Sequence, residues 1–172
     1  MTLDFKAPRV ILPQASWKAR PSTGLERRGM SNAPLILLID GNREDREYYT
    51  QLLRISSPGF DVLHVPTGRV GLALCKQQLI DCVVLELDLD DMSGFEVLLR
   101  LIPRVLHPKI AVVILTRLAN PYLLEAAINN GAQAALNKST TSGDILVKAI
   151  LTAMSTVKTD RQFHRRLITR DL

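Results

Sequence analysis

The chain has 172 residues, of which 47% are hydrophobic and 23% are charged, values typical of one globular domain with some chain to spare. No window approaches the roughly 18 to 20 apolar residues of a membrane span, and the first residues lack the apolar core of a signal peptide. Two cysteines, Cys75 and Cys82, are too few for a disulfide framework. We therefore expect a reduced, cytoplasmic protein without a membrane span.

The formal net charge of +5 belongs to the two ends of the chain. Residues 1–33 carry six Lys or Arg against two Asp or Glu, and residues 156–172 carry five against two. The middle, residues 34–155, carries eleven against thirteen. We interpret 1–33 as a flexible basic extension and 156–172 as a basic tail or helix extension. Because no base-stacking aromatic residues are interleaved with these charges, nucleic acid is not the expected partner.

From Pro34 onward, apolar strand-like runs alternate with amphipathic helices. The predicted strands are 35–39, 60–65, 82–87, 110–116 and 132–137. The first helix is capped by Asn42, with Asp45 at its third position, and the next begins at Gly68. The remaining helices are predicted over 95–101, 121–130 and 141–153.

Five strands alternating with five helices predict a doubly wound, five-stranded parallel sheet with helices on both faces, a (βα)5 flavodoxin-like fold. In such sheets the working site lies at the carboxyl ends of the strands. The first strand ends in Asp40, and the third ends in Glu86, which Asp88 follows closely. Thr116 ends the fourth strand, and Lys138 follows the fifth. We therefore expect carboxylates, a hydroxyl and an ammonium group to converge at one edge.

Four separated motifs resemble a response-regulator receiver domain, the phosphoacceptor module of two-component signalling. They are LLIDG, DCVVLELDLDDMSGFEVLLRL, IAVVILT and GAQAALNKS, at the first, third, fourth and fifth strands. The resemblance covers Pro34 to about Ala153 and implies a receiver-like domain over 34–155. It also implies a signalling module rather than an enzyme, with a histidine kinase or a downstream effector as partner.

The resemblance assigns roles to the residues at the strand ends. In the family, an Asp accepts a phosphoryl group, a divalent metal neutralises the oxygens, and Lys and Thr or Ser contact the phosphate. Glu86, and not an Asp, stands at the phosphoacceptor position, and Thr116 and Lys138 stand at the phosphate-contact and switch positions. Asp40 is the first of the paired acidic positions. Its metal set would be completed by Glu86 and by the backbone carbonyl of Asp88.

Three further positions depart from the family pattern: Gly41 at the second acidic position, Ala135 at the switch aromatic and Ser139 at the proline after the lysine. Glu in place of Asp moves the carboxylate by about 1.5 Å, and a displacement near 1 Å can cost about a hundredfold in rate. Since Mg²⁺ demands near-ideal octahedral oxygens, we expect no cofactor or only weak Mg²⁺ binding. The longer Glu86 is expected to pair directly with Lys138.

The favoured function is a degenerate receiver that acts as a phosphorylation-independent protein-interaction module. Two alternatives stay open. One is an active receiver phosphorylated at Glu86 or at a neighbouring Asp in the acidic loop of Asp88, Asp90 and Asp91. The other is a flavodoxin-like ligand-binding domain, which rests on fold-level analogy alone.

Two surfaces are predicted to meet partners. In the family, signalling commonly passes through the face of the fourth helix, fifth strand and fifth helix, which here includes Tyr122 and Ala135. The last helix is also expected to run on through Val157 toward Leu167, because no Pro or Gly interrupts it. Such an arm would suit a homodimer or a partner helix.

Overall fold

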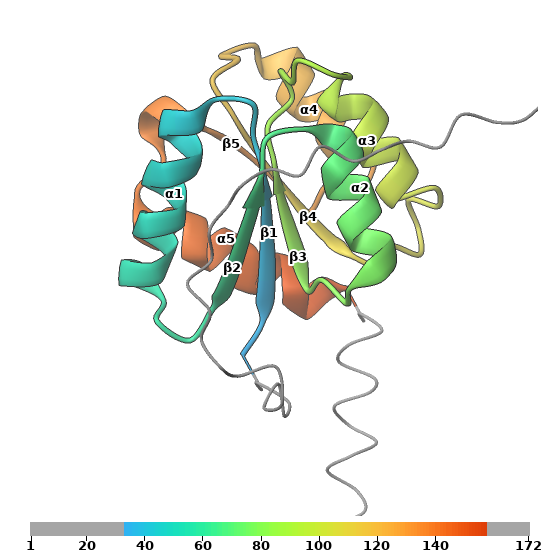
Figure 1. Cartoon of the computed structure of the whole chain (residues 1–172). Coiled ribbons are helices and arrows are strands. Elements are labelled where there is room, and N and C mark those ends of the chain that lie inside the picture. Colours follow the sequence, from blue (N-terminus) through green and yellow to red (C-terminus); the bar gives the residue numbers. More distant parts are fainter. Residues whose placement is uncertain (1–32, 158–172) are drawn as a thin grey trace, which may run out of the picture. The chain divides into compact units, whose positions relative to one another are not determined.

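The computed structural model of the chain describes residues 33–157, which form a five-stranded parallel sheet in the order β2-β1-β3-β4-β5 with helices on both faces (Figure 1). The strands are β1 (Leu35–Ile39), β2 (Asp61–Val65), β3 (Cys82–Leu85), β4 (Ala111–Thr116) and β5 (Ala134–Asn137). The helices are α1 (Arg43–Ser56), α2 (Gly68–Gln77), α3 (Gly94–Leu101), α4 (Pro121–Asn129) and α5 (Gly143–Thr156), with a short 3₁₀ turn, η1 (Lys138–Thr140), before α5. The predicted fold class is confirmed.

The strand order places β1 at the point where the connections change direction. The chain leaves β1 for β2 on one side and then crosses to β3 on the other. Ile39 at the end of β1 pairs with Leu85 at the end of β3. The residues after them, Asp40 and Glu86, therefore lie next to each other at the carboxyl edge of the sheet.

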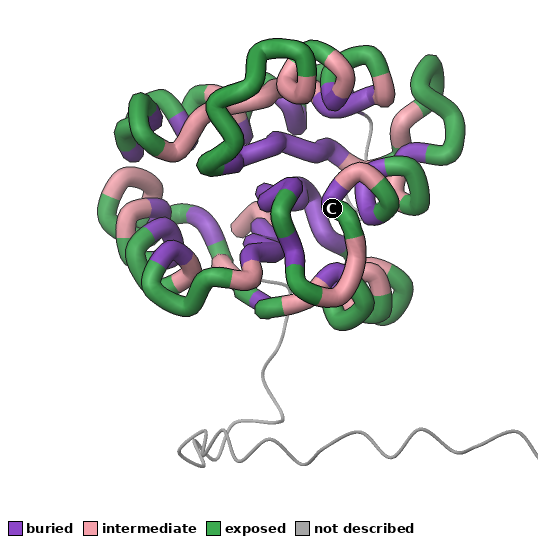
Figure 2. The backbone as a smooth tube through the Cα atoms, turned by 90° about the horizontal axis from the view of Figure 1, so that it is seen from above, coloured by how far each residue is buried: buried purple, intermediate pink, exposed green. Residues whose placement is uncertain are grey.

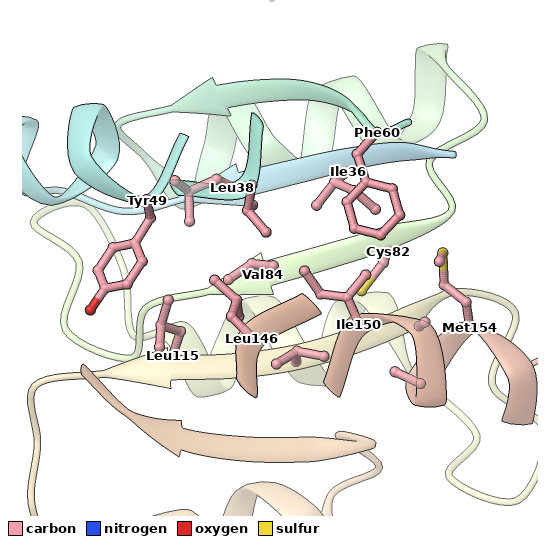
Figure 3. Close-up of a cluster of buried hydrophobic side chains, with 14 of the residues drawn as sticks. Ile36, Leu38, Tyr49, Phe60, Cys82, Val84, Leu115, Leu146, Ile150 and Met154 are labelled. Atoms are coloured by element: carbon pink, nitrogen blue, oxygen red, sulfur yellow. The ribbon is translucent and has the colours of Figure 1, made fainter. Parts of the chain in front are cut away.

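Alternate residues of the strands feed two separate cores, one on each face of the sheet. The core on the α1 and α5 side contains Ile36, Leu38, Val84 and, from α5, Leu146 and Ile150, with the α5 side chains pointing toward the sheet (Figure 3). The core on the α2, α3 and α4 side contains Leu37, Ile39, Leu85, Val97, Ile114 and Ala127. Buried segments concentrate in the middle layer, and exposed segments face outward on the helices (Figure 2). This double burial explains why the strands are almost uniformly apolar.

Local sequence signals set the starts of the helices. The side chain of Asn42 accepts a hydrogen bond from the backbone N–H of Asp45 at 3.0 Å, so the predicted cap of α1 is confirmed. The last helix starts later than expected, at Gly143, because Ser142 serves as its cap. The third strand ends at Leu85, two residues earlier than predicted.

The predicted continuation of the last helix through Val157 is wrong. Helix α5 ends at Thr156, and Val157 has an extended backbone, with φ −109° and ψ 120°. The side chain of Val157 is 1% exposed and belongs to the core on the α1 and α5 side, so packing there turns the chain out of the helix. The rest of the expected arm, like nearly all of the predicted basic extension over 1–33, lies outside the described residues. Within 33–157, no helix combines the length and apolar character needed to cross a bilayer.

Candidate functional site at the carboxyl ends of the strands

Four strands deliver the predicted site residues to one edge of the sheet. Asp40 follows β1, Glu86 follows β3, Thr116 ends β4 and Lys138 follows β5. The backbone N–H of Glu86 donates to the carbonyl of Ile39 at 2.9 Å, which fixes the two carboxylate-bearing positions side by side. The expected convergence of carboxylates and an ammonium group is present.

The ammonium group of Lys138 lies between three carboxylates. Its Nζ is 2.5 Å from Oδ2 of Asp40, 2.7 Å from Oδ2 of Asp45 and 2.7 Å from Oε2 of Glu86. The Lys138 side chain is only 5% exposed, and all three acidic residues are buried. The predicted Glu86–Lys138 ion pair is therefore present, as part of a larger buried network.

Asp40 and Glu86 each have a carboxylate oxygen that does not contact Lys138, and backbone N–H groups donate hydrogen bonds to these oxygens. Oδ1 of Asp40 accepts a hydrogen bond from the backbone N–H of Asn42 at 2.9 Å. Oε1 of Glu86 accepts from the backbone N–H groups of the next two residues, at 2.7 and 3.1 Å. Oε2 of Glu86 also accepts from the backbone N–H of Arg117 at 3.3 Å. These contacts hold the buried carboxylates without any outside ligand.

Asp45 and Arg117 are site residues that sequence reasoning missed. The guanidinium group of Arg117 binds Asp45 through two bonds, Nε to Oδ2 at 2.8 Å and Nη2 to Oδ1 at 2.5 Å. The side chain of Arg117 is 63% exposed and reaches from the residue after β4 to the first turn of α1. The sequence pattern assigns Asp45 to helix capping alone. The first turn of a helix that follows a strand lies at the same edge as the strand ends, and this position is the sequence signal that places Asp45 at the site.

The charges in the network shift one another's proton affinities. Arg117, followed by Lys138, holds the pKa of Asp45 at about 2, although burial alone would raise it. Burial alone would lower the pKa of Lys138, but its hydrogen bonds to Asp40, Asp45 and Glu86 raise it instead. Burial raises the pKa of Asp40, against the opposing effect of Lys138. The ammonium and the Asp45 carboxylate are therefore charged at neutral pH.

Tyr49 of α1 supports Lys138 from the core side. Its hydroxyl donates to the carbonyl of Lys138 at 3.2 Å, and its ring centroid lies 5.9 Å from Nζ. Figure 3 shows the ring within the buried cluster, with the hydroxyl at its margin. The tyrosine thus ties the start of η1 to α1.

The acidic loop after β3 divides into two parts. Asp88 and Asp90 are exposed and line a cavity of about 330 Å³ together with Asp40 and Glu86. Asp91 instead accepts hydrogen bonds from two backbone N–H groups at the start of α2, at 2.9 and 3.0 Å. Asp91 therefore caps a helix, and Asp88 and Asp90 are the loop carboxylates at the cavity.

The loop geometry depends on one glycine. A Cβ atom at Gly94 would lie 2.4 Å from the carbonyl oxygen of Glu86 and 2.5 Å from Cα of Leu87. The backbone at the start of α3 therefore packs directly against the segment that carries Glu86.

Thr116 and the three positions that differ from the family pattern lie in different surroundings. Thr116 is fully buried, and its hydroxyl oxygen accepts from the backbone N–H of Leu118 at 3.1 Å; the residue is not part of the cavity lining. A Cβ at Gly41 would lie 3.6 Å from the nearest side chain, that of Asp90, so a side chain has room there. Ala135 is half-buried on β5, and Ser139 lies in η1.

The donor set does not fit a divalent metal as it stands. Within residues 33–157, no three His, Cys, Asp or Glu side chains are grouped so as to hold a metal ion. The three residues of the predicted set, Asp40, Glu86 and Asp88, line one cavity, but the ammonium group of Lys138 lies between the carboxylates of Asp40 and Glu86, where a metal ion would have to bind. An ammonium group supplies positive charge but cannot act as an octahedral metal centre.

Comparison with known proteins identifies relatives of this chain by sequence. The Transcriptional regulatory protein GlrR of Escherichia coli is 28% identical over 120 residues, which are 69% of this chain and 26% of that protein. Transcriptional regulatory protein QseF, also from Escherichia coli, gives the same figures. The chain therefore spans about a quarter of the length of these curated relatives.

Solved structures agree with the sequence relatives. A response regulator receiver domain protein from Clostridium thermocellum is 26% identical, with a TM-score of 0.63, and the match covers 72% of this chain and 95% of that one. A CheY-like receiver domain protein from Methanospirillum hungatei has the same TM-score and coverage at 22% identity, a likeness in fold alone. The sequence profile described as "Response regulator receiver domain" matches residues 36–150. By this match the chain belongs to the response regulator receiver domain family.

Proposed function

We propose that this receiver domain is a protein-interaction module of two-component signal transduction that works without being phosphorylated. The observation that carries the proposal is the position of Lys138, whose ammonium group is within 2.7 Å of Asp40, Asp45 and Glu86. The buried carboxylates already have protein donors on both of their oxygens. Lys138 and Arg117 bring two positive charges to these three carboxylates, so the residues of the site hold one another without a bound metal.

The same contacts work against phosphoryl transfer. A carboxylate nucleophile must present a free oxygen in line with the phosphorus, and cations must neutralise the transferred group. Oε2 of Glu86 is held by Lys138 at 2.7 Å and by the backbone N–H of Arg117 at 3.3 Å. Both contacts must be displaced before that oxygen can attack. The added methylene of Glu moves the nucleophile as well.

The proposed module is a signalling component and not an enzyme, and it acts in the cytoplasm. Its partner is a histidine kinase or a downstream effector. The face of α4, β5 and α5 is the proposed contact surface, and Tyr122 on α4 is 80% exposed there. With Ala135 in place of an aromatic ring, this face should keep one conformation. Self-association as a homodimer belongs to the same proposal.

A second candidate, an active receiver, is favoured by one observation. Asp88 and Asp90 are exposed and line the cavity beside Glu86, so two carboxylates there are accessible to a phosphoryl donor. Thr116 and Lys138 also stand at the positions that the family uses to contact phosphate. A flavodoxin-like ligand-binding role ranks behind both, because the chain belongs to the receiver family.

Incubation of the full chain with acetyl phosphate and Mg²⁺, followed by intact-mass measurement, separates the two candidates. We expect no gain in mass, because Glu86 is held by Lys138 and the donor set does not fit the metal. A stoichiometric phosphoryl group mapped to Glu86 would overturn the proposal. A phosphoryl group mapped to Asp88 or Asp90 would establish the second candidate.

The double variant Glu86→Asp/Gly41→Asp tests whether the lost chemistry can be rebuilt. The shorter carboxylate draws back from Lys138, and position 41 has room for a side chain. We expect Mg²⁺ to bind at least about tenfold more tightly than to the wild-type chain, because an acidic ligand is added. The control is Glu86→Asp/Gly41→Asn, which has nearly the same shape without the added charge. Equal Mg²⁺ affinity in all three proteins would show that position 41 does not face the pocket.

A further inference from the structure

A second cavity lies at the other end of the sheet, between α2 and α3. It has a volume of about 240 Å³ and opens at the amino ends of β3 and β4. Its walls are largely apolar and include Leu72 and Cys75 of α2, Leu101 of α3, and Ile80 and Ile110, which precede the two strands. The receiver chemistry described above uses none of these residues.

The lining of this cavity carries positive charge. Lys76, Arg100 and Lys109 line it, and no Asp or Glu does. Arg100 is paired with Glu96 at 2.5 Å, whereas Lys76 and Lys109 are exposed and make no ion pair within residues 33–157. This local excess of positive charge is unusual, because residues 34–155 as a whole carry more acidic than basic side chains. An apolar cavity bordered by unpaired ammonium groups suits an anionic partner with an apolar part.

The size of the cavity and its surroundings favour a peptide over a small molecule. About 240 Å³ is below the roughly 300–1,000 Å³ of typical small-molecule pockets, but it suits one large side chain acting as an anchor. The connection between α3 and β4, whose two ends line the cavity, also exposes Val105 and Leu106, the latter by 87%. Neither residue lines the cavity itself, and exposed apolar side chains on the same connection suit a peptide, which contacts more surface than a small ligand does.

The two ends of the chain carry a net charge of the same sign as the lining of this cavity. Residues 1–33 carry six basic against two acidic side chains, and residues 156–172 carry five against two. Such segments would be repelled by Lys76, Arg100 and Lys109. An acidic segment of another protein therefore complements the charge of the cavity better than either end does.

We propose that the cavity between α2 and α3 is a docking site for an acidic peptide segment of a partner protein. One aromatic or large aliphatic side chain of the peptide fills the cavity, and flanking carboxylates contact Lys76, Arg100 and Lys109. Because this site is remote from Glu86, it functions whether or not the receiver is phosphorylated. A phosphorylated Glu86 would overturn the proposed function and leave this docking site intact.

The probe is an acetylated and amidated pentapeptide with a phenylalanine between two acidic pairs, EDFED. Two control peptides are EDAED, which lacks the anchor, and KKFKK, which reverses the charge. Heteronuclear NMR of the full chain should show shifts of the Leu72, Leu101 and Ile110 amides with EDFED only. Binding should weaken as salt is raised, because the flanking contacts are exposed.

Cys75 gives a second readout. It lines the cavity, whereas Cys82, the other cysteine of the sequence, is fully buried. Burial raises the pKa of the Cys75 thiol to about 11, so alkylation by N-ethylmaleimide is slow and easily followed at mildly alkaline pH. EDFED should slow alkylation of Cys75 further, and EDAED should not.

Charge-reversal variants locate the contact. Lys76→Glu/Lys109→Glu should weaken EDFED binding about tenfold or more, since two ammonium contacts become repulsive. The matched control is Arg54→Glu/Lys148→Glu, which makes the same change in net charge at exposed positions of α1 and α5. The control should bind EDFED to within about twofold of the wild-type chain, because Arg54 and Lys148 do not line the cavity and distant exposed charges contribute little to binding.

Several results would overturn the proposal. They are no binding of EDFED at millimolar concentration, equal binding of EDAED, equal weakening by both double variants, or shifts confined to another face. Protection of Cys75 by vesicles of anionic phospholipid but not by EDFED would assign the cavity to lipid. Concentration-dependent protection by the chain alone, together with sedimentation as an oligomer, would assign it to a second copy.

Discussion

The two ends of the sheet use charge in opposite ways. At the carboxyl ends, Lys138 is buried and touches three carboxylates, and these charged groups come from α1 and from the ends of β1, β3 and β5. At the amino ends of β3 and β4, Lys76 and Lys109 are exposed beside an apolar cavity and have no ion pair within residues 33–157. Desolvation costs roughly several kcal/mol per buried ion, so Lys138 and its carboxylates must be paired. Lys76 and Lys109 stay hydrated and need no partner.

This difference separates what holds the domain together from what is available to a partner. The pocket around Lys138 connects elements that are far apart in the sequence, and Arg117 adds a link from β4 to α1. A charge in such a network affects the stability of the whole domain. At the cavity between α2 and α3, the described part of the chain pairs Arg100 with Glu96 on the surface of α3 and leaves Lys76 and Lys109 free to contribute to binding.

The largest effect is expected from Lys138→Met. The substitution keeps most of the side-chain volume but leaves Asp40, Asp45 and Glu86 without their shared cation. Breaking a buried ion network by removing one partner typically costs about 3–5 kcal/mol, and we expect a loss of this size in the free energy of unfolding. Urea titration followed by circular dichroism measures it.

The control for that loss is Lys148→Met, which removes an exposed ammonium from α5. It should change the free energy of unfolding by no more than about 0.5 kcal/mol. Equal effects of the two substitutions would mean that the carboxylates are not dependent on Lys138, and the contrast between the two ends of the sheet would fail.

Acid pH should weaken the carboxyl-end network through Asp45. The pKa of Asp45 is about 2 in the folded chain, below its ordinary value of 3.8, chiefly because of Arg117. A lowered folded pKa stabilises the domain above the ordinary value, and this contribution is lost as pH falls from about 4 to about 2. The loss should be on the order of 1–2 kcal/mol.

The variant Asp45→Asn isolates this contribution. It should be less stable than the wild-type chain at neutral pH, but its unfolding free energy should fall less steeply between about pH 4 and pH 2, because the titrating group is gone. Parallel curves for the two proteins, measured by urea titration at each pH, would show that Asp45 is not the group responsible.

Arg117→Ala should lower the free energy of unfolding less than Lys138→Met does, because the guanidinium group is 63% exposed and its pair with Asp45 is screened by water. Arg43→Ala is the matched control, since Arg43 pairs with Glu47 in a fully surface-exposed i,i+4 arrangement at 2.8 Å. That control should lose less stability than Arg117→Ala, because both partners of its pair are exposed to water. If both variants lose the same, the Asp45–Arg117 pair behaves as an ordinary surface pair.

The fold and the backbone positions of the site were predictable because they follow from periodicity. Apolar runs of strand length fix β1, β3 and β4, and a parallel sheet necessarily collects their last residues at one edge. Asp40, Glu86 and Lys138 were therefore found without any knowledge of side-chain geometry. The pair between Glu86 and Lys138 followed from the length of the glutamate side chain.

What the sequence did not predict depends on tertiary contacts. Asp45 reads as a capping residue. Its place in the first turn of α1 puts it at the same edge as the strand ends, but its contact with Lys138 depends on how α1 packs against the sheet. The roles of Arg117 and of the Thr116 hydroxyl depend on rotamers, which no sequence pattern specifies. Val157 continues an uninterrupted helical pattern, yet its burial in the core ends α5. At Val157 a long-range contact overrides the local signal, and at Asp45 a long-range contact adds a second role to the local one.

The smallest effects on stability are expected at the cavity between α2 and α3. They test most directly whether the charges at this end of the sheet serve binding and not stability. Lys76→Glu should cost a few tenths of a kcal/mol, roughly, because Lys76 lies in the last turn of α2 and its charge complements the helix dipole. Lys109→Glu should cost less still, because Lys109 lies in the connection before β4. Both substitutions should nevertheless weaken binding of EDFED, as measured by NMR titration beside urea unfolding. A loss above about 1 kcal/mol in either variant would place that lysine in a stabilising network, and the two ends of the sheet would then use charge in the same way.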